Sequence, residues 1–329
     1  MTAAGIAEEG LTIICIPVYN DWESVRALIV ALSTASPGTG ESFAVLLIDD
    51  GSTEPPPDDL ATEGLDQVEV LRLRRNVGHQ RAIAIGLSYL HRHRPCRTVV
   101  VMDGDGQDGA EDVPLLLKRC RENGGRTIVF ARRTRRSEDL FFLAGYHAYR
   151  LIHRLLTGRR VEVGNFSAIP FALLDSLVGI SELWNHYAAA VIHARLPVES
   201  IPIPRRRRIA GETRMNTATL MIHGLSAISV YSVTVVVRLM ALTGGLFALT
   251  GAGVFALFCA RLFTGVAIPS GIFAAAGFLA FALLSMLLLL LIFVLVLLGG
   301  RNGAPFLPIR DWEYYVIDLP RSAPASDAN

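Results

Sequence analysis

The sequence predicts an α/β fold with a mainly parallel, doubly wound sheet, followed by a membrane-associated part. Between residues 11 and 131, short β-branched runs alternate with amphipathic helical patterns. Residues 241–300, in contrast, contain a single charged side chain, Arg261. At 329 residues and 51% hydrophobic composition, the chain can hold a sizeable soluble domain and a membrane anchor.

Each predicted element follows from a local pattern. Asn20 and Glu23 form a capping-box signature that predicts the start of the first helix, and a short helical piece is expected near 58–64. Predicted strands are 11–19, 43–48, 68–73, 97–102, 126–131 and 198–204. Further predicted helices are 78–92, 111–122, 140–158, 171–179 and 184–195.

Polar side chains follow the first five predicted strands. They are Asn20, Asp49, Asp50, Asn76, Asp103, Asp105 and Arg132. Because open α/β sheets bind ligands outside the carboxyl ends of their strands, this convergence predicts a ligand site at that edge.

The stretch "VVVMDGDGQDGAED" at residues 99–112 is the most informative of these strand ends. On an extended segment Asp103 and Asp105 share one face, as suits a divalent cation that bridges phosphate oxygens. An EF-hand is excluded because Asp108 and Pro114 occupy the positions that need Gly and Glu. A Walker-type site is excluded too, because the sequence has no GxxxxGK[ST].

The apolar C-terminal part predicts two membrane spans. Residues 241–260 and 266–300 lack charge, and a helix needs about 20 residues to cross a bilayer. Residues 215–237 also lack charged side chains, but their Ser, Thr, Asn and His content favours helices lying in the interface over a third span. The expected divisions are a soluble domain at 1–210, interfacial helices at 211–239, a membrane hairpin at 240–300 with spans near 241–261 and 270–298, and a tail at 301–329.

Charge and cysteine placement narrow the setting. Arginines flank the hairpin on both sides, which predicts that the soluble domain and both termini are cytoplasmic. Arginine clusters at 132–136 and 205–208 could meet a phosphate or an anionic lipid surface, and no nucleic-acid partner is expected. The four cysteines show neither zinc-site nor disulfide spacing, which fits a reducing compartment.

Five motifs together resemble one known family. In order they are "PVYN", "DDGS", "NVGHQRAIAIG", "MDGDGQD" and "GETR". They are similar to those of the inverting family 2 glycosyltransferases of the GT-A fold, in the branch that acts on polyprenyl phosphates and includes dolichol-phosphate mannose synthase. The resemblance runs from about residue 11 to the end of the second span.

The resemblance implies a function. Residues 1–210 would be a cytoplasmic GT-A glycosyltransferase domain that moves a sugar, with inversion, from a UDP- or GDP-linked donor to dolichyl or undecaprenyl phosphate. The implied cofactor is Mg²⁺ or Mn²⁺, the setting is a multi-pass protein of the cytoplasmic membrane, and a homo-oligomer is compatible with it.

The resemblance also implies roles for individual residues. Nucleotide-sugar contacts would be Pro17, Tyr19, Asn20, Asp49, Asp50, Asn76, Gly78, Arg81 and Asp103. Metal ligands would be Asp103, Asp105 and Gln107, and catalytic residues Asp103, Asp105 and Arg132. Acceptor and phosphate contacts would be Arg132, Asn165, Arg208, Thr213 and Arg214. Arg135, Arg136 and Arg205 are expected on a solvated or lipid-facing surface.

Two departures from the family pattern bear on mechanism. The prolines usual after the acidic motif are absent, and Asn165 in "GNF" replaces an acidic residue, so it cannot act as a base. A base is not required, because a phosphomonoester with a second pKa of about 6 is largely ionised at neutral pH.

Three other classes of protein are alternatives to a polyprenyl-phosphate glycosyltransferase. Processive polysaccharide synthases need a QxxRW motif, and the glutamines here, Gln67, Gln80 and Gln107, do not form one. A transferase with another lipid or saccharide acceptor remains open, as does an inactive membrane scaffold, although the intact acidic motif argues against loss of activity.

Overall fold

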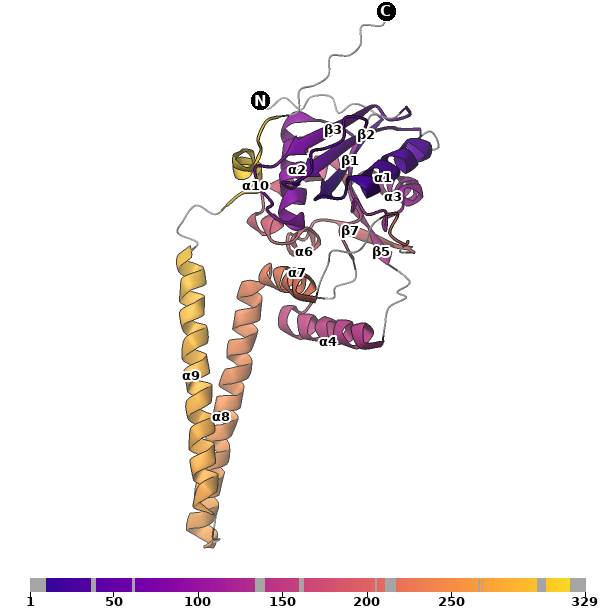
Figure 1. Cartoon of the computed structure of the whole chain (residues 1–329). Helices are drawn as coiled ribbons and strands as arrows, with labels where there is room; N and C mark the ends of the chain where they lie inside the picture. Colours follow the sequence, from indigo (N-terminus) through magenta and orange to yellow (C-terminus); the bar gives the residue numbers. More distant parts are fainter. Residues whose placement is uncertain are drawn as a thin grey trace, which may run out of the picture. The chain divides into compact units, whose positions relative to one another are not determined.

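The computed structural model describes two compact units in one chain (Figure 1). The described residues are 10–36, 40–60, 63–133, 140–159, 163–204, 206–210, 217–265, 267, 269–300 and 306–319. The first unit comprises Met1–Gly145, Val161–Val230 and Phe306–Asn329, and the second comprises Tyr146–Arg160 and Tyr231–Pro305.

A seven-stranded, mostly parallel sheet forms the centre of the first unit. Its strands are β1 (Leu11–Val18), β2 (Ser42–Asp49), β3 (Gln67–Arg72), β4 (Thr98–Val101), β5 (Ile128–Arg133), β6 (Ser167–Pro170) and β7 (Val198–Ile203), in the order β3-β2-β1-β4-β6-β5-β7. β6 is antiparallel to both β4 and β5, and the other pairings are parallel. The predicted α/β class and all six predicted strands are confirmed, and β6 was not predicted.

Helices cover both faces of this sheet. They are α1 (Trp22–Ala35), α2 (His79–His93), η2 (Ala110–Asp112), α3 (Val113–Glu122), α5 (Phe171–Val178), η3 (Ser181–Trp184) and α6 (Tyr187–His193). A further helix of the first unit, α7 (Thr217–Ser229), does not belong to these layers. Side chains alternate along β1, so Ile13 and Cys15 pack towards α2 while Ile14 and Ile16 pack towards α1 and α3. α2 packs closely on the sheet, since a Cβ on Gly86 would lie 2.8 Å from the Cys15 sulfur.

Two local predictions were wrong. The capping box fails because Asn20 adopts φ 51°, so Asp21 becomes the N-cap of α1 without a side-chain hydrogen bond. Asn20 instead accepts from the backbone N–H of Thr53, at 2.8 Å. The expected helical piece near 58–64 is also absent, because the described residues there form only turns.

The C-terminal segment at 306–319 belongs to the first unit and is not a free tail. It holds α10 (Pro308–Asp311) and η4 (Trp312–Tyr315), and Trp312 is 1% exposed against Tyr89 and His93 of α2. Beyond η4, Val316 forms an antiparallel bridge with Leu73. The segment therefore fills the α2 face of the core and covers the edge of the sheet at β3.

The second unit contains three helices: part of α4 (Leu140–Thr157), α8 (Ser232–Thr264) and α9 (Ser270–Gly300). Two stretches, Ser232–Thr264 and Ser270–Gly299, are long and apolar enough to cross a membrane. α8 begins before residue 240, so the predicted interfacial segment at 211–239 contains both α7 and the first turns of α8. Arg238 of α8 donates to the Leu155 carbonyl of α4 at 3.0 Å, which fastens these helices together.

The burial of Trp312 gives a test of the returning segment. Trp312→Ala is expected to lower the free energy of unfolding by about 3–5 kcal/mol, because it leaves a large cavity against α2. Tyr314→Ala is the matched control, since Tyr314 is 77% exposed and its loss should change stability little. Denaturant unfolding of the full chain in detergent measures both. Equal stability of the two variants would show that the segment does not contribute to the core.

Candidate active site

Two loops at the carboxyl ends of β1 and β2 are locked to each other. The left-handed turn at Asn20 directs its side-chain oxygen to the N–H groups of Thr53 and Glu54, at 2.8 and 3.4 Å. The backbone N–H of Asn20 donates in return to the Ser52 hydroxyl at 2.9 Å. Asn20 is therefore a structural clamp at the predicted nucleotide end of the sheet.

Asp50 holds the next loop in place. Its two carboxylate oxygens accept from the backbone N–H groups of Val77 and Gly78, at 2.7 and 3.0 Å. Burial raises the pKa of Asp50 to about 6, although these hydrogen bonds oppose the rise. Gly51 makes the approach possible, because it has φ 70° and a Cβ there would lie 2.5 Å from the Asn76 nitrogen.

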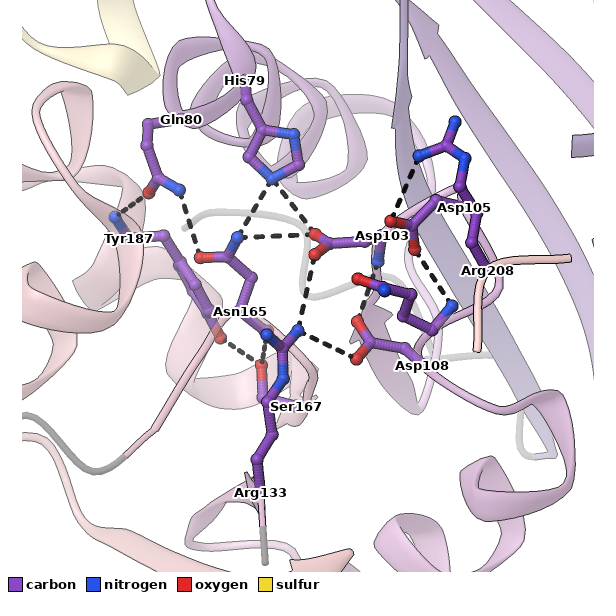
Figure 2. A network of polar contacts seen from close by, with 11 residues as sticks. His79, Gln80, Asp103, Asp105, Asp108, Arg133, Asn165, Ser167, Tyr187 and Arg208 are labelled. Carbon is purple, nitrogen blue, oxygen red and sulfur yellow. Dashed lines mark hydrogen bonds and ion pairs between the residues drawn. The ribbon is translucent and has the colours of Figure 1, made fainter. Parts of the chain in front are cut away.

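Asp103, the first residue of the acidic motif, lies at the centre of a polar network (Figure 2). Its carboxylate is 3.1 Å from His79 Nε2, 3.5 Å from Asn165 Nδ2 and 3.7 Å from an Arg133 guanidinium nitrogen. Burial would raise the pKa of Asp103, but His79 and then Arg133 outweigh it and hold that pKa below its usual range. Burial would lower the pKa of His79, but the contact with the Asp103 carboxylate outweighs burial and raises that pKa. Asp103 is thus held as a carboxylate.

Asp108 shapes the acidic loop from within. It is buried, accepts from the Asp103 N–H at 3.1 Å and lies 3.4 Å from Arg133. Burial, and then the charge of Asp103, raise the pKa of Asp108 to about 7. Its role in this structure is to fix the turn that presents Asp103.

A later segment, residues 206–209, covers the loop around Asp105. Ile209 N–H donates to the Asp105 carbonyl at 3.1 Å, and Arg208 lies 3.5 Å from the Asp105 carboxylate and also pairs with Asp21. A Cβ on Gly106, whose φ is 74°, would lie 2.2 Å from Ile209. Gly106 is therefore required for the segment to close on the acidic loop.

The orientation of Asn165 is set by a chain of hydrogen bonds that starts at the main chain (Figure 2). The N–H of Tyr187 donates to Gln80 Oε1 at 2.7 Å, so Gln80 Nε2 must face Asn165 and donates to its oxygen at 3.2 Å. Asn165 Nδ2 therefore points to Asp103 and lies 3.0 Å from His79 Nε2. The amide is a donor towards the acidic motif.

The structure brings some predicted residues together and separates others. Asp103 and Asn165 meet directly, Asp105 meets Arg208, and Asp50 meets Gly78. Arg81 instead lies over the Trp184 ring, 5.4 Å from its centroid, and the Asp49 carboxylate lies 3.7 Å from the Arg72 side chain. Pro17 is buried in β1. The remaining predicted contacts are exposed: Tyr19, Asn76 and Arg132. Thr213 and Arg214, as well as Arg135, Arg136 and Arg205, lie outside the described residues.

Six residues of the network were not predicted as site residues: His79, Gln80, Asp108, Arg133, Ser167 and Tyr187. His79 and Gln80 stand in the motif "NVGHQRAIAIG", so their place in it was a usable signal. Arg132 and Arg133 face opposite sides of β5, and only Arg133 is within ion-pair distance of Asp103 and Asp108. Choosing between them required the register of β5, which the sequence does not reveal.

The acidic loop has the donor chemistry of a site for a hard divalent cation. Asp103 and Asp105 supply carboxylates and Gln107 an amide oxygen, the ligands that Mg²⁺ takes when it shares its sphere with phosphates. Burial is the main cause of the raised pKa of Asp108, and the charges of Asp103 and Asp105 add to it. In the part of the chain that the structure describes, no three His, Cys, Asp or Glu side chains form a complete metal cage. The residues therefore fit a cation that a bound diphosphate completes.

A mostly parallel sheet with an Asp-x-Asp loop at its carboxyl edge defines the chain as a glycosyltransferase of the GT-A class. Residues 13–177 match the family profile described as glycosyl transferase family 2, and the chain belongs to that family. The predicted family and enzyme class are thereby confirmed.

Curated relatives agree with the predicted polyprenyl-phosphate branch. An undecaprenyl-phosphate 4-deoxy-4-formamido-L-arabinose transferase of Enterobacter sp. (strain 638) is 27% identical over 318 residues, which cover 92% of this chain and 91% of that protein. A Bacillus subtilis protein, named uncharacterized glycosyltransferase YkcC, is 26% identical over 226 residues, or 67% of this chain and 68% of that one.

Among solved structures, glucosyl-3-phosphoglycerate synthase from Mycobacterium tuberculosis, in complex with Mn²⁺ and UDP-glucose, has a similar fold. The TM-score is 0.50 at 15% identity, with 70% of this chain and 80% of that chain covered. At this identity the similarity establishes the fold alone, and it confirms the GT-A fold class.

The contrast between the two arginines at the end of β5 is testable. Arg133→Gln is expected to lower kcat/KM about tenfold to a hundredfold, because hydrogen bonds to charged groups contribute about 1.5–3 kcal/mol. Arg132→Gln, its exposed neighbour, should have a smaller effect. Sugar-transfer kinetics on both variants measure the difference. A larger loss of kcat/KM for Arg132→Gln than for Arg133→Gln would support the catalytic role that the sequence predicts for Arg132.

Proposed function

We propose that the protein transfers a sugar, with inversion and with the help of a divalent metal, from a nucleotide sugar to a polyprenyl phosphate. The observation that carries the proposal is the oriented Asp103 carboxylate at the carboxyl edge of a family 2 fold, in a chain that also holds two helices able to cross a membrane. A relative that matches nine-tenths of the chain is named as an undecaprenyl-phosphate transferase, which supports this acceptor class.

The donor is proposed to bind across the loops after β1, β2 and β4. Pro17, Tyr19, Asn20, Asp49 and Asp50, with the loop at 76–81, would form the nucleotide end. Asp50 keeps that loop closed through Val77 and Gly78. The sugar would be linked to UDP or GDP, and the Mycobacterium tuberculosis enzyme with a similar fold was crystallised with UDP-glucose.

Asp103 and Asp105, with Gln107, would hold Mg²⁺ or Mn²⁺, and that cation would neutralise charge on the departing nucleoside diphosphate. The chain's own residues do the rest. His79 and Asn165 keep the Asp103 carboxylate oriented, and Arg133 and Arg208 place positive charge beside it and beside Asp105.

No protein base is needed at the acceptor. A polyprenyl phosphate brings an ionised oxygen, and attack on the anomeric carbon would break the bond to the diphosphate oxygen in the same step. Asn165 is directed at Asp103 as a hydrogen-bond donor. Its place in the network is therefore compatible with catalysis by positioning and charge.

The topology proposed is a cytoplasmic catalytic domain on a membrane hairpin. α7 precedes α8, and residues 306–319 follow α9, yet both belong to the first unit. If α8 and α9 both cross a bilayer, the catalytic domain and the returning segment share one side. Flanking arginines favour the cytoplasmic side. The domain of residues 1–210 would then be completed by residues 306–319.

The proposed reaction predicts a specific product. Membranes that carry the full chain, incubated with a panel of UDP- and GDP-sugars and a polyprenyl phosphate, are expected to yield a lipid-linked monosaccharide with one donor or a few. Mass spectrometry of the extracted lipids identifies it, and membranes with Asp103→Asn serve as the control. Absence of such a lipid with every donor would overturn the proposed acceptor class.

The metal role predicts a separate loss. Asp105→Asn is expected to lower kcat/KM about 100-fold or more, since metal stabilisation of the leaving group contributes several kcal/mol. EDTA should abolish transfer, and added Mn²⁺ or Mg²⁺ should restore it. Asp59→Asn is the matched control, because the Asp59 side chain is 68% exposed and remote from the acidic loop in sequence. Transfer that survives EDTA would contradict the metal role and leave the acceptor assignment standing.

A further inference from the structure

Two histidines that no motif points to pack against each other in the first unit. His186 begins α6 as its N-cap, and His223 lies in the middle of α7. Their ring centroids are 4.7 Å apart with an interplanar angle of 45°. His186 is fixed in turn, because its Nδ1 accepts from the N–H of Ala189 at 3.4 Å, which leaves Nε2 to carry the proton of the neutral ring.

His223 lies in the electrostatic neighbourhood of the acidic motif. Burial is the largest influence on the pKa of His223 and lowers it. The charges of His79 and Arg133 lower it further, and the charge of Asp103 raises it. The three residues that act on His223 are the ones that meet at the centre of the site. A neutral imidazole there can donate one hydrogen bond without adding charge.

The two sides of α7 differ in exposure, and His223 belongs to the inner one. Met221, Ile222 and Leu225 are 61–64% exposed, whereas Ala227 and Val230 are buried. His223 and Ala227 are four residues apart, which places them on one stripe of the helix. α8, the first candidate membrane span, begins three residues after α7 ends. One side of α7 is thus apolar and exposed, and His223 lies away from it.

The order of the strands places the proposed nucleotide loops towards one end of the sheet. Asn20 and Asp50 follow β1 and β2, and β3 lies beyond them at one end of the sheet. Asp103 follows β4 at the middle, and Arg133 ends β5 on the other side of it. His223 contacts His186, and the next residue, Tyr187, is linked to Asn165 through Gln80. The histidine pair therefore lies on the Asn165 side of Asp103.

We propose that His223 donates a hydrogen bond to the phosphate group of the lipid acceptor, and that His186 positions the His223 ring for this contact. The inference rests on the proposed function and assigns the acceptor contact to α7, the helix that precedes α8 in the sequence. His223 would be an acceptor-binding residue, and His186, which acts through it, a positioning residue.

The test is steady-state kinetics of the full chain in detergent, with a short-chain polyprenyl phosphate and the nucleotide sugar that supports transfer in the donor panel. His223→Phe is expected to raise KM for the polyprenyl phosphate about tenfold, the effect of losing one hydrogen bond to a charged group. KM for the nucleotide sugar should stay within about twofold. His223→Gln, whose amide can still donate, should recover most of the loss.

The positioning role of His186 has its own signature. His186→Ala should also raise KM for the acceptor, but it should add nothing in the His223→Phe background, because it acts through that ring. His193→Phe is the matched control, an exposed histidine of the same helix, and should leave both KM values unchanged. His223→Ala, checked by thermal unfolding, provides a second truncation if the phenylalanine variant does not fold.

The outcomes distinguish a failure of the histidine assignment from a failure of the proposed function. Acceptor KM that is unchanged in both His223 truncations, with wild-type transfer intact, would overturn the histidine assignment and leave the proposed function standing. Wild-type protein that transfers no sugar to any polyprenyl phosphate would overturn both. An additive effect of His186→Ala on His223→Phe would overturn the positioning role alone.

Discussion

The site depends on one constraint: the Asp103 carboxylate must stay ionised and correctly turned although it is largely out of water. Burial alone would favour its neutral form, and His79, Arg133 and Asn165 reverse that preference from three sides. The direction of Asn165 follows from Gln80, and that of Gln80 from the Tyr187 main chain. A side chain at the end of β4 is thereby oriented by the start of α6, far away in the sequence, so the packing of α2 and α6 is part of the active-site geometry.

Much of this arrangement is predictable from the sequence because it arises from local pattern. β-branched runs identify β1 to β5, and the rule that ligands bind at the carboxyl ends of strands selects Asp49, Asp50, Asp103 and Asp105. The two apolar helices follow from their length and lack of charge. Each of these inferences needs only neighbours in the chain.

The parts that were missed depend on pairing between distant segments. β6 has four residues and ends in Pro170, and it becomes a strand because β4 and β5 both accept it as an antiparallel partner. The choice of Arg133 over Arg132 is a matter of register, and a shift of one residue exchanges the two faces. From the sequence, Trp312 belongs to a C-terminal tail, whereas in the structure it is buried against α2. From the sequence, Asn20 is a candidate helix cap, whereas in the structure its side-chain oxygen accepts from the backbone N–H of Thr53, in the loop after β2.

The substitution of Asn165 for an acidic residue is consistent with this charge balance. Asp103, Asp105 and Asp108 already gather on one loop, where burial, and then the charges of Asp103 and Asp105, raise the pKa of Asp108 to about 7. A carboxylate at 165 would face Asp103 and lose the amide proton that Asp103 accepts. A neutral donor avoids that repulsion and leaves Arg133 and Arg208 for the acidic loop and the phosphates it would bind.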